Sequence, residues 1–381
     1  ALFETVSGFT TTGASILSDV ESLSHCILLW RSFTHWIGGM GVLVFILCLL
    51  PLTGGYHMNL MKAESPGPSV SKLVPKVQST AKILYTIYII LTIVEIIFLL
   101  IGKMPLFDTL CLSFGTAGTG GFGIKNDSIA SYSTYNQVVI TVFMILFGIN
   151  FNAYYLLLTK KVMQAAKNEE VRYYLGIIGL AIVAIAINTR EMFTSFGRAF
   201  QQAAFQVGSI ITTTGYATTD FNVWPVFSKT ILVILMFVGA CAGSTGGGIK
   251  VSRLLILCKS ARKELQLYLH PNAVKKIKMD DKAIPHEVVR ATNMFLFVYI
   301  MIFVTSLLII SLDNLDMVSN FTAIAATLNN IGPGLGAVGP TGNFNTYSYI
   351  SKAVMIFDML AGRLEVFPLL LLFKRDTWRK F

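Results

Sequence analysis

Long apolar stretches alternate with short polar ones along the chain, a pattern typical of a multi-pass membrane protein. A helix that crosses a bilayer needs about 20 predominantly apolar residues. We interpret seven stretches as membrane spans. They are roughly Ile27–Leu52, Ile83–Ile101, Gln137–Leu158, Tyr173–Ile187, Val226–Gly248, Thr292–Leu312 and Tyr349–Phe373.

Four further apolar segments are too short to cross, and each ends in a run rich in Gly and in Thr or Asn. Irregular backbone at membrane depth is tolerated only where it is buried in protein or lines water. We therefore expect short helices that enter the membrane and return. These segments are Ala1–Thr12, Leu106–Ala117, Phe196–Thr213 and Val318–Asn329.

The composition agrees with a membrane protein, because 54% of the 381 residues are hydrophobic and only 13% are charged. A soluble domain carries about 25% charged residues, and a disordered chain has far less apolar content. The net charge of +10 initially suggests a nucleic-acid partner. The distribution of the charges argues against it, since the basic residues form separate loops without interleaved aromatic residues.

Four polar stretches hold 22 of the 30 basic residues, and the loops with the short segments hold nine of the 20 acids but few basic residues. Basic loops favour the cytoplasmic side of a membrane. We therefore expect the short segments to enter from outside. The basic stretches are Thr53–Lys82, Lys160–Arg172, Lys250–Arg290 and Lys374–Phe381.

One unit is repeated four times, in the order span, short helix, glycine loop, span. The copies align on Gly13, Gly120, Gly215 and Gly332. The first copy lacks its leading span, and we expect at least one span to precede Ala1. The predicted repeats cover residues 1–52, 53–160, 161–255 with an interrupted last span, and 256–381 with its preceding cytoplasmic loop.

A ring of four such loops suits a monovalent cation, which must exchange its water shell for fixed oxygens when it crosses a membrane. Glycine permits the unusual backbone that turns carbonyls inward. The C-terminal end of each short helix adds about −0.5 charge, which favours a cation. A lone TTTG run is more often a purely structural turn, so the hypothesis depends on the fourfold repetition.

Seven motifs make the chain similar to the TrkH/KtrB/HKT superfamily of potassium transporters, and to its TrkH-type members above all. The resemblance implies an all-α membrane protein with four pseudo-equivalent M1–P–M2 repeats around one pore. The motifs are Ser7–Ser15, Trp36–Val44, Gly115–Gly123, Ile211–Phe221, Gly239–Lys250, Asn329–Pro340 and Met359–Leu370.

The resemblance also implies which residues form the K⁺ filter. Relatives that favour Na⁺ carry Ser at the first filter position, so Gly13 indicates K⁺. The second and fourth loops depart from TTTG, so we do not expect a fourfold symmetric ring. The expected filter residues are Thr11, Thr12, Gly13, Gly118, Thr119, Gly120, Thr213, Thr214, Gly215, Asn330, Ile331 and Gly332.

The span Val226–Gly248 ends in a segment with five glycines, each of which costs a helix about 1 kcal/mol relative to Ala. This irregular segment is expected to line the pore below the filter, although close helix packing also explains small residues. The resemblance implies a gate that includes an arginine inside the last span. The expected gate residues are Gly239, Gly243, Ser244, Thr245, Gly246, Gly247, Gly248, Lys250 and Arg363.

Arg363 lies within an apolar stretch, where a charge must be paired, hydrated or drawn to the interface. Its neighbours in sequence, Asp358 and Glu365, are not at the i±3 or i±4 spacing that pairs side chains on a helix. Two interpretations stay open. Arg363 either reaches the cytoplasmic interface or, as the resemblance implies, faces the pore as a barrier to cations.

The resemblance implies potassium uptake across the bacterial cytoplasmic (inner) membrane, by a homodimer in the lipid bilayer with a cytosolic, TrkA-type nucleotide-binding regulator. ATP, ADP or NAD is expected only on that regulator, and K⁺ is the transported ion. The alternative is a membrane-embedded enzyme or carrier that binds a phosphate-bearing substrate at GSTGGGIK. The phosphate-loop pattern GxxxxGK[ST] is absent, and no catalytic cluster is visible. A channel and a symporter coupled to H⁺ or Na⁺ both fit the sequence.

Overall fold

The computed structural model describes residues 1–41, 77–272 and 276–364, and within these ranges the chain is almost entirely helical. The predicted all-α class is confirmed. The helices are α1 Leu2–Phe9, α2 His25–Gly39, α5 Val77–Ile101, α6 Leu106–Gly118, α7 Thr134–Phe147, α8 Phe151–Leu158, α9 Val162–Ala166, α10 Glu169–Asn188, α11 Phe196–Ile211, α12 Val226–Val238, α13 Val251–Leu269, α14 His286–Ile310, α15 Met317–Leu328 and α16 Tyr349–Arg363.

Short 3₁₀ turns and one small hairpin complete the described fold. The hairpin, β1 Lys278–Met279 and β2 Lys282–Ala283, was not predicted; its turn residues Asp280 and Asp281 both have positive φ, as a type I′ turn requires. The 3₁₀ turns are η1 Arg190–Met192, η2 Phe221–Val223, η3 Ser311–Asp313, η4 Gly336–Val338 and η5 Phe344–Thr346.

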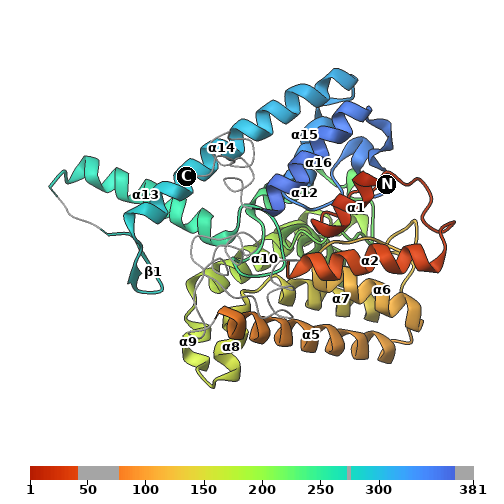
Figure 1. Ribbon diagram of the computed structural model, residues 1–381, viewed down its shortest axis with the longest axis horizontal. Coiled ribbons are helices and arrows are strands. Elements are labelled where there is room, and N and C mark those ends of the chain that lie inside the picture. The colour runs from red at the N-terminus through yellow and green to blue at the C-terminus, as the bar shows by residue number, and fades with distance from the viewer. Residues whose placement is uncertain (42–76, 273–275, 365–381) are drawn as a thin grey trace, which may run out of the picture.

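The helices follow the predicted order of long helix, short helix and second helix. The short helices α1, α6, α11 and α15 coincide with the segments expected to enter the membrane and return. Each packs on a neighbouring longer helix, as α6 does on α2 and α11 on α10. In Figure 1, α13 and the hairpin project from one end of the molecule, and the α1–α2 loop lies at the other.

Within the described ranges, three helices are long and apolar enough to cross a membrane alone: Ala81–Ile101, Glu169–Asn188 and His286–Asp313. Residues at helical spacing on the outer face of α5 (Ile90, Ile93, Ile97) remain exposed. An exposed apolar stripe of this kind is expected where lipid replaces water. The predicted spans Ile27–Leu52 and Tyr349–Phe373 extend beyond the described residues.

The predicted span Gln137–Leu158 is not one continuous helix, because α7 and α8, which together are long and apolar enough to cross a membrane, meet at a bend of 90°. The side chain of Asn150 accepts a hydrogen bond from the N–H of Asn152 (2.9 Å) and so starts a new helix. Gly148 allows the bend to approach the Tyr174 hydroxyl, where a Cβ would collide. The Gly-rich break after Val238 was predicted, and α12 ends there.

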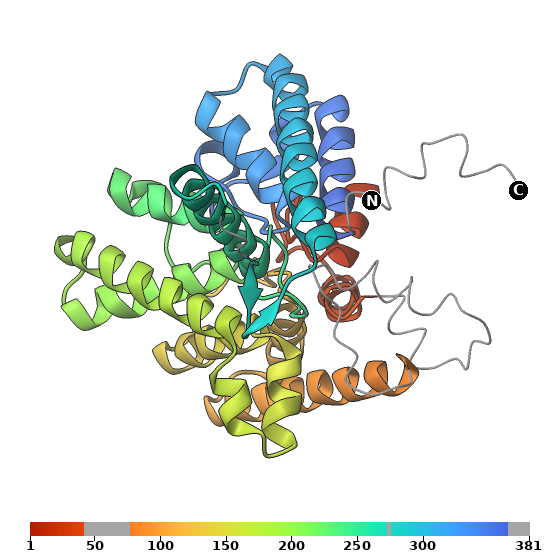
Figure 2. The same ribbon diagram turned by 90° about the vertical axis from the view of Figure 1, so that its left-hand side faces the viewer.

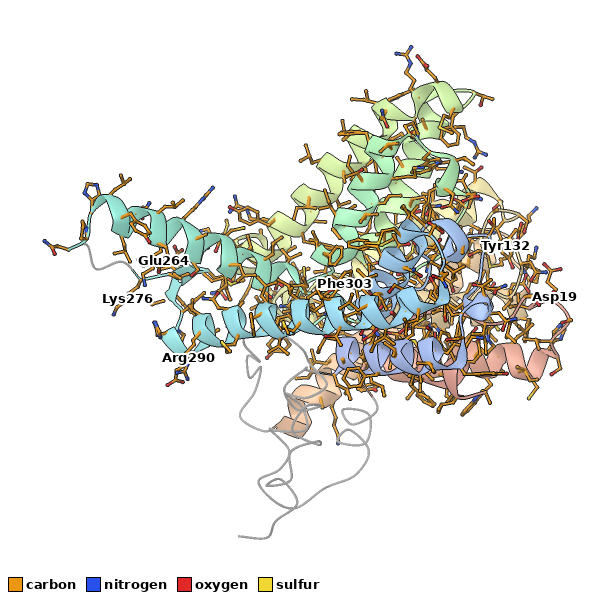
Figure 3. The ribbon with its side chains drawn as sticks, turned by 90° about the horizontal axis from the view of Figure 1, so that it is seen from above. Asp19, Tyr132, Glu264, Lys276, Arg290 and Phe303 are labelled. Carbon is orange, nitrogen blue, oxygen red and sulfur yellow. The ribbon has the colours of Figure 1, made fainter. Side chains whose placement is uncertain are left out.

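Acidic and basic loops lie at opposite ends of the molecule, as the charge pattern predicts. Figure 3 shows Glu264, Lys276 and Arg290 at the end formed by α13, the hairpin and the start of α14. Asp19 and Tyr132 lie at the far end. The predicted cytoplasmic stretches Thr53–Lys82 and Lys374–Phe381 lie wholly or mostly outside the described residues.

Candidate functional site

The four short helices end in one shared backbone conformation near the centre of the molecule. In each, a residue one or two positions past the end of the helix adopts a left-handed conformation that non-glycine residues seldom use. The φ angles are 53°, 54°, 59° and 56° at Thr11, Thr119, Thr213 and Asn330.

The hydrogen bonds at these ends are also shared. At α1, the N–H of Thr11 donates to the carbonyl of Gly8 (3.0 Å), and the N–H of Thr12 donates to the carbonyl of Ser7 (2.9 Å). The other three ends make the same two bonds at the same spacing. This is a Schellman motif, so the sequence differences among the four loops do not change their backbone.

A left-handed glycine follows two residues later in each loop and touches the neighbouring loop. A Cβ placed on Gly332 would lie 2.8 Å from the carbonyl oxygen of Thr12. A Cβ on the corresponding glycine of each other loop would collide with a carbonyl oxygen of the next loop. The first loop therefore touches the second, and so on until the fourth touches the first. The four approaches are Gly13 to Gly120, Gly121 to Thr214, Gly215 to Ile331 and Gly332 to Thr12.

These contacts correct the predicted alignment of the second loop by one residue. Gly121, not Gly120, has the left-handed conformation of Gly13 (φ of 74° and 76°). Gly120 instead takes the place of Thr12 and presents its carbonyl to Gly13. Gly118, predicted as a filter residue, is the last residue of α6 and lies outside the ring contacts.

His35 explains why the second loop departs from TTTG. Its imidazole is fully buried against Phe122, with ring centroids 4.2 Å apart, and occupies the space that a side chain on Gly120 would need. The backbone carbonyl of His35 excludes a Cβ on Gly118 in the same way. Glycine is therefore required at both positions by the close approach of α2.

Hydroxyl groups brace the loops where threonine is present. The Thr10 and Thr12 hydroxyls lie 2.8 Å apart, and so do those of Thr212 and Thr214. In the fourth loop, the side chain of Asn330 donates to the Thr12 hydroxyl (2.9 Å) and joins the first loop to the fourth. These side-chain bonds brace the first, third and fourth loops of the ring.

A cavity of about 200 Å³ lies beyond the ring and is lined by residues from all four loops, among them Gly13, Gly121, Gly215 and Gly332. Ser15 and Arg31 also line it. The cavity lies on the side of the α1–α2 loop, which is the end predicted to face outside.

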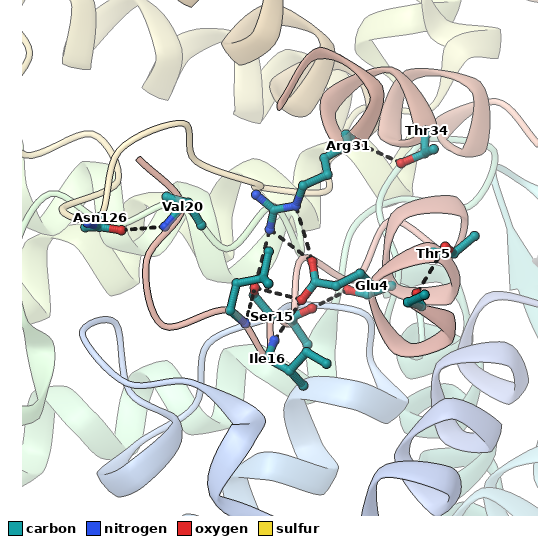
Figure 4. Close-up of polar contacts among 12 residues, drawn as sticks. Glu4, Thr5, Ser15, Ile16, Val20, Arg31, Thr34 and Asn126 are labelled. Atoms are coloured by element: carbon teal, nitrogen blue, oxygen red, sulfur yellow. Dashed lines mark hydrogen bonds and ion pairs between the residues drawn. The ribbon is translucent and has the colours of Figure 1, made fainter. Parts of the chain in front are cut away.

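A buried ion pair anchors the first loop beside this cavity (Figure 4). Arg31 on α2 donates to the Glu4 carboxylate on α1 (3.1 Å), and its guanidinium lies 4.0 Å from the centre of the Phe122 ring. The other oxygen of Glu4 accepts from the Ser15 hydroxyl (2.8 Å) and the Ile16 N–H (2.7 Å). Glu4 thus connects α1, α2 and the chain that leaves the ring.

The Gly-rich segment between α12 and α13 lies against the opposite side of the ring. The N–H of Gly247 donates to the Thr213 hydroxyl (2.6 Å), and the Thr119 hydroxyl donates to the carbonyl of Thr245 (2.9 Å). A Cβ on Gly247 would lie 2.6 Å from the carbonyl of Asn329. The segment thereby contacts the second, third and fourth loops, and Gly246 and Gly247 lie closest to them.

Other contacts hold the Gly-rich segment to the bend between α7 and α8. Cys241 donates its N–H to the carbonyl of Gly148 (3.1 Å), and the Phe151 N–H donates to the carbonyl of Gly243 (3.0 Å). The Ser244 hydroxyl donates to the carbonyl of Cys241 (2.6 Å). Gly239, Gly243 and Gly248 have positive φ, which explains why a regular helix does not continue here.

Arg363 reaches the Gly-rich segment and the C-terminal end of α2. Its guanidinium donates to the carbonyls of Thr245 (2.8 Å), Gly38 (2.5 Å) and Gly39 (2.7 Å). Lys250 is buried as well, and its ammonium donates to the carbonyl of Gly246. Two cations therefore lie directly behind the ring, held by backbone carbonyls.

Glu170 is a site residue that the sequence analysis missed. It lies in the first turn of α10 with 3% of its surface exposed, and it accepts hydrogen bonds from the backbone N–H groups of Ala242 (2.6 Å) and Ser252 (3.1 Å). An acid in the first turn of a helix is common on surfaces because it favours the helix dipole. The sequence therefore carried no signal that this one is buried.

The geometry argues against a phosphate-binding loop at GSTGGGIK. A phosphate needs several free N–H donors, but here the Gly247 N–H binds Thr213 and the Ala242 N–H binds the Glu170 carboxylate. Lys250 is already bound to the loop. The loop instead presents the carbonyl of Thr245 to Arg363 and that of Gly246 to Lys250, which is the arrangement expected around cations.

Replacing Gly121 by Ala is expected to destabilise the protein, whereas Gly176→Ala should not. The new Cβ would require a left-handed alanine and would collide with the carbonyl of Thr214. Strain of this kind costs about 2 kcal/mol or more. At Gly176 there is nothing within 4 Å of an added Cβ. Thermal unfolding of both variants in detergent measures the difference; equal melting temperatures would contradict the corrected alignment.

Glu4→Gln is expected to lower stability by about 2 kcal/mol, because Arg31 would keep its buried charge without an anionic partner. Glu191→Gln removes an exposed acid from η1 and serves as the control. The readout is the melting temperature of each purified variant. A loss no larger than that of the control would show that the ion pair does not anchor the first loop.

Comparisons with known proteins agree with this geometry over the whole chain. A family model for TrkH, described as a cation transport protein, matches residues 1–379. The Trk system potassium uptake protein TrkH of Salmonella typhimurium is 38% identical, over 100% of this chain and 79% of its own length. The TrkH protein of Vibrio parahaemolyticus is 39% identical over the same shares.

The crystal structure of the potassium transporter TrkH from Vibrio parahaemolyticus is similar to this fold, with a TM-score of 0.85 and 36% identity. The alignment covers 99% of this chain and 78% of that one. The prediction of a non-enzymatic, multi-pass protein of the bacterial cytoplasmic membrane is confirmed by these relationships, and the membrane-enzyme alternative is set aside. The chain belongs to the TrkH family of cation transport proteins.

Proposed function

We propose that this protein mediates potassium uptake by letting K⁺ pass through the ring formed by the four loops. The observation that carries the proposal is the closed cycle of approaches between each left-handed glycine and the carbonyl of the next loop. Such a cycle gathers backbone oxygens from four directions, which is how a dehydrated monovalent cation is coordinated. Relatives named as potassium uptake proteins support K⁺ as the ion.

The filter proposed here is the three-residue stretch that each loop contributes, with the second loop in its corrected register. Four helix C-termini meet at these stretches and add negative potential for a cation. Gly118 is replaced by Gly121 in the set. The proposed filter residues are Thr11, Thr12, Gly13, Thr119, Gly120, Gly121, Thr213, Thr214, Gly215, Asn330, Ile331 and Gly332.

Acids at the outer end would raise the cation concentration at the cavity. The amide of Asn126 hydrogen-bonds the carboxylate of Asp19 (2.8 Å) and lowers the pKa of that group. A hydrogen bond from Ser319 likewise lowers the pKa of Asp316 at the start of α15. Both groups therefore stay ionised at neutral pH.

We infer that the Gly-rich segment and Arg363 form a closed gate on the cytoplasmic side of the ring. The segment contacts three of the four loops, and Arg363 places a positive charge beside its carbonyls. A cation that leaves the ring must displace the segment and pass this charge. The proposed moving part is Gly246–Gly248, with Gly239, Gly243, Ser244, Thr245 and Lys250 as its supports.

The resemblance to the family supports two further assignments, a homodimer and a cytosolic nucleotide-binding regulator of the TrkA type. The regulator would carry ATP, ADP or NAD, and we propose that it would face α13 and β1, at the end predicted to be cytoplasmic. Nucleic acid has no role in the proposal.

Gly215→Asp is expected to abolish uptake of ⁸⁶Rb⁺ into liposomes. The aspartate side chain would collide with the carbonyl of Ile331 and break the ring at two loops. Gly176→Ala is the control, and size-exclusion chromatography tests assembly. Thr214→Val is a milder companion that keeps the volume but loses the hydroxyl contact to Thr212. We expect it to reduce K⁺ over Na⁺ discrimination; unchanged flux and selectivity in both variants would refute the filter.

Arg363→Gln is expected to raise the basal flux of the purified protein by about tenfold, because a barrier of about 1.4 kcal/mol from the charge is removed. Glutamine keeps the first part of the side chain and removes the charge, and the contact of the outer guanidinium nitrogen with the carbonyl of Thr245 is lost with it. Arg190→Gln, at the outer end, is the matched control. Rubidium uptake without any regulator is the measurement, and a fall in flux would argue against a barrier role.

A further inference from the structure

A single carboxylate oxygen accepts hydrogen bonds from both ends of the Gly-rich segment. Oε1 of Glu170 accepts from the Ala242 N–H near the start of the segment and from the Ser252 N–H in the first turn of α13. The second oxygen accepts from the side chain of Asn150 (3.4 Å) at the bend between α7 and α8. Glu170 thus joins three parts of the chain that surround the segment.

These bonds matter because the segment has few others across its base. The Val251 N–H donates to the carbonyl of Ala240 (3.1 Å) and is the neighbouring bond between the two ends. A charge-assisted hydrogen bond to a buried carboxylate is stronger than a bond between neutral groups. Glu170 therefore adds charge-assisted hydrogen bonds to the contacts that keep the ends of the segment together.

The adjacent residue, Glu169, connects the same helix end to the cytoplasmic elements. Its carboxylate pairs with the ammonium of Lys259 on α13 at 2.6 Å, and Lys259 also donates to the carbonyl of Lys278 in β1 (2.8 Å). The Glu169 N–H donates to the carboxylate of Asp280 in the hairpin turn (2.7 Å). Figure 2 shows the hairpin at the face of the molecule where α13 and α10 meet.

The two glutamates therefore bind different parts of the chain from the same end of α10. Neighbouring residues on a helix point about 100° apart, so Glu170 turns into the protein while Glu169 turns to the cytoplasmic surface. Because both glutamates lie in the first turn of α10, a displacement of the hairpin or of α13 that pulled on this turn through Glu169 would also move the Glu170 carboxylate relative to the ends of the Gly-rich segment.

We propose that Glu170 is a positioning residue that holds the Gly-rich segment against the ring, and that Glu169 and Lys259 couple this latch to the cytoplasmic hairpin. The proposal rests on the proposed function, because it assumes that the segment is the gate. It assigns the site at which a force on α13 or on the hairpin reaches the ion path. The partner that supplies the force is not part of the assignment.

The test uses the native thiol of Cys241, which is buried inside the Gly-rich segment. The other cysteines (Cys26, Cys48, Cys111 and Cys258) are replaced by serine or alanine, and labelling by a water-soluble maleimide reports exposure of the segment. In the full-length protein in liposomes, Glu170→Gln is expected to raise the labelling rate by at least about tenfold, since the charged acceptor is lost. Glu264→Gln, an exposed acid on α13, is the matched control.

A double-mutant cycle of Glu169→Gln, Lys259→Met and the double variant tests whether the Glu169–Lys259 pair couples the hairpin to the Gly-rich segment. Each single change should raise the labelling of Cys241 by the same factor, and the double change should add nothing, because both remove one pair. These variants leave Glu170 intact, so they also serve if Glu170→Gln does not fold. Independent, additive effects would overturn the coupling.

Flux separates this inference from the function on which it rests. If labelling of Cys241 and basal ⁸⁶Rb⁺ flux both rise in Glu170→Gln, the latch and the gate are supported. If labelling rises while flux is unchanged, the latch is supported and the segment is not the gate. If labelling equals that of Glu264→Gln, the latch is overturned, whatever the flux.

Discussion

The structure depends on how closely backbone can approach backbone at the centre of a membrane protein. Each loop brings the Cα of a left-handed glycine against the carbonyl of the next loop, and this contact leaves no space for a side chain. Backbone polar groups at this depth have no bulk water to bind, so they require either partners in the protein or an ion. The Schellman ends satisfy N–H groups of each loop internally.

The supports around the ring differ from loop to loop, although the backbone is the same. Threonine hydroxyls brace the first and third loops, Asn330 joins the fourth to the first, and His35 fills the space behind the second. The fourfold pattern is therefore a pattern of main-chain conformation. Its sequence is free to vary wherever a neighbouring helix supplies the missing volume or hydrogen bond.

This difference decides what could be predicted from the sequence. Length and hydropathy are local properties, so the short helices and the Gly-rich break were found at nearly their observed bounds. The register of the second loop was missed by one residue, because Gly120 and Gly121 are equivalent until α2 and His35 are in place. The bend at Gly148 was missed for a similar reason, since its cause is the approach to Tyr174.

Of the charged residues beside the Gly-rich segment, Arg363 could be predicted from the sequence and Glu170 could not. Arg363 could be recognised because a cation in an apolar stretch is costly and rare. Its partners could not, since they are the carbonyls of Thr245, Gly38 and Gly39 and not acidic side chains. Glu170 lies in the first turn of a helix, where acids are ordinary, so only its burial marks it.

The Gly-rich segment is bound by an anion at its N–H groups and by cations at its carbonyls. Glu170 binds N–H groups at its two ends, while Arg363 and Lys250 bind carbonyls at its middle, Thr245 and Gly246. The segment is therefore held in one orientation by groups that no other orientation would satisfy together. In the proposed opening, a shift that frees the middle from Arg363 would leave two cations near the ring, so those charges would also have to move or become hydrated. A backbone with five glycines would favour such a movement, and the free energy needed to separate these charged hydrogen bonds would oppose it.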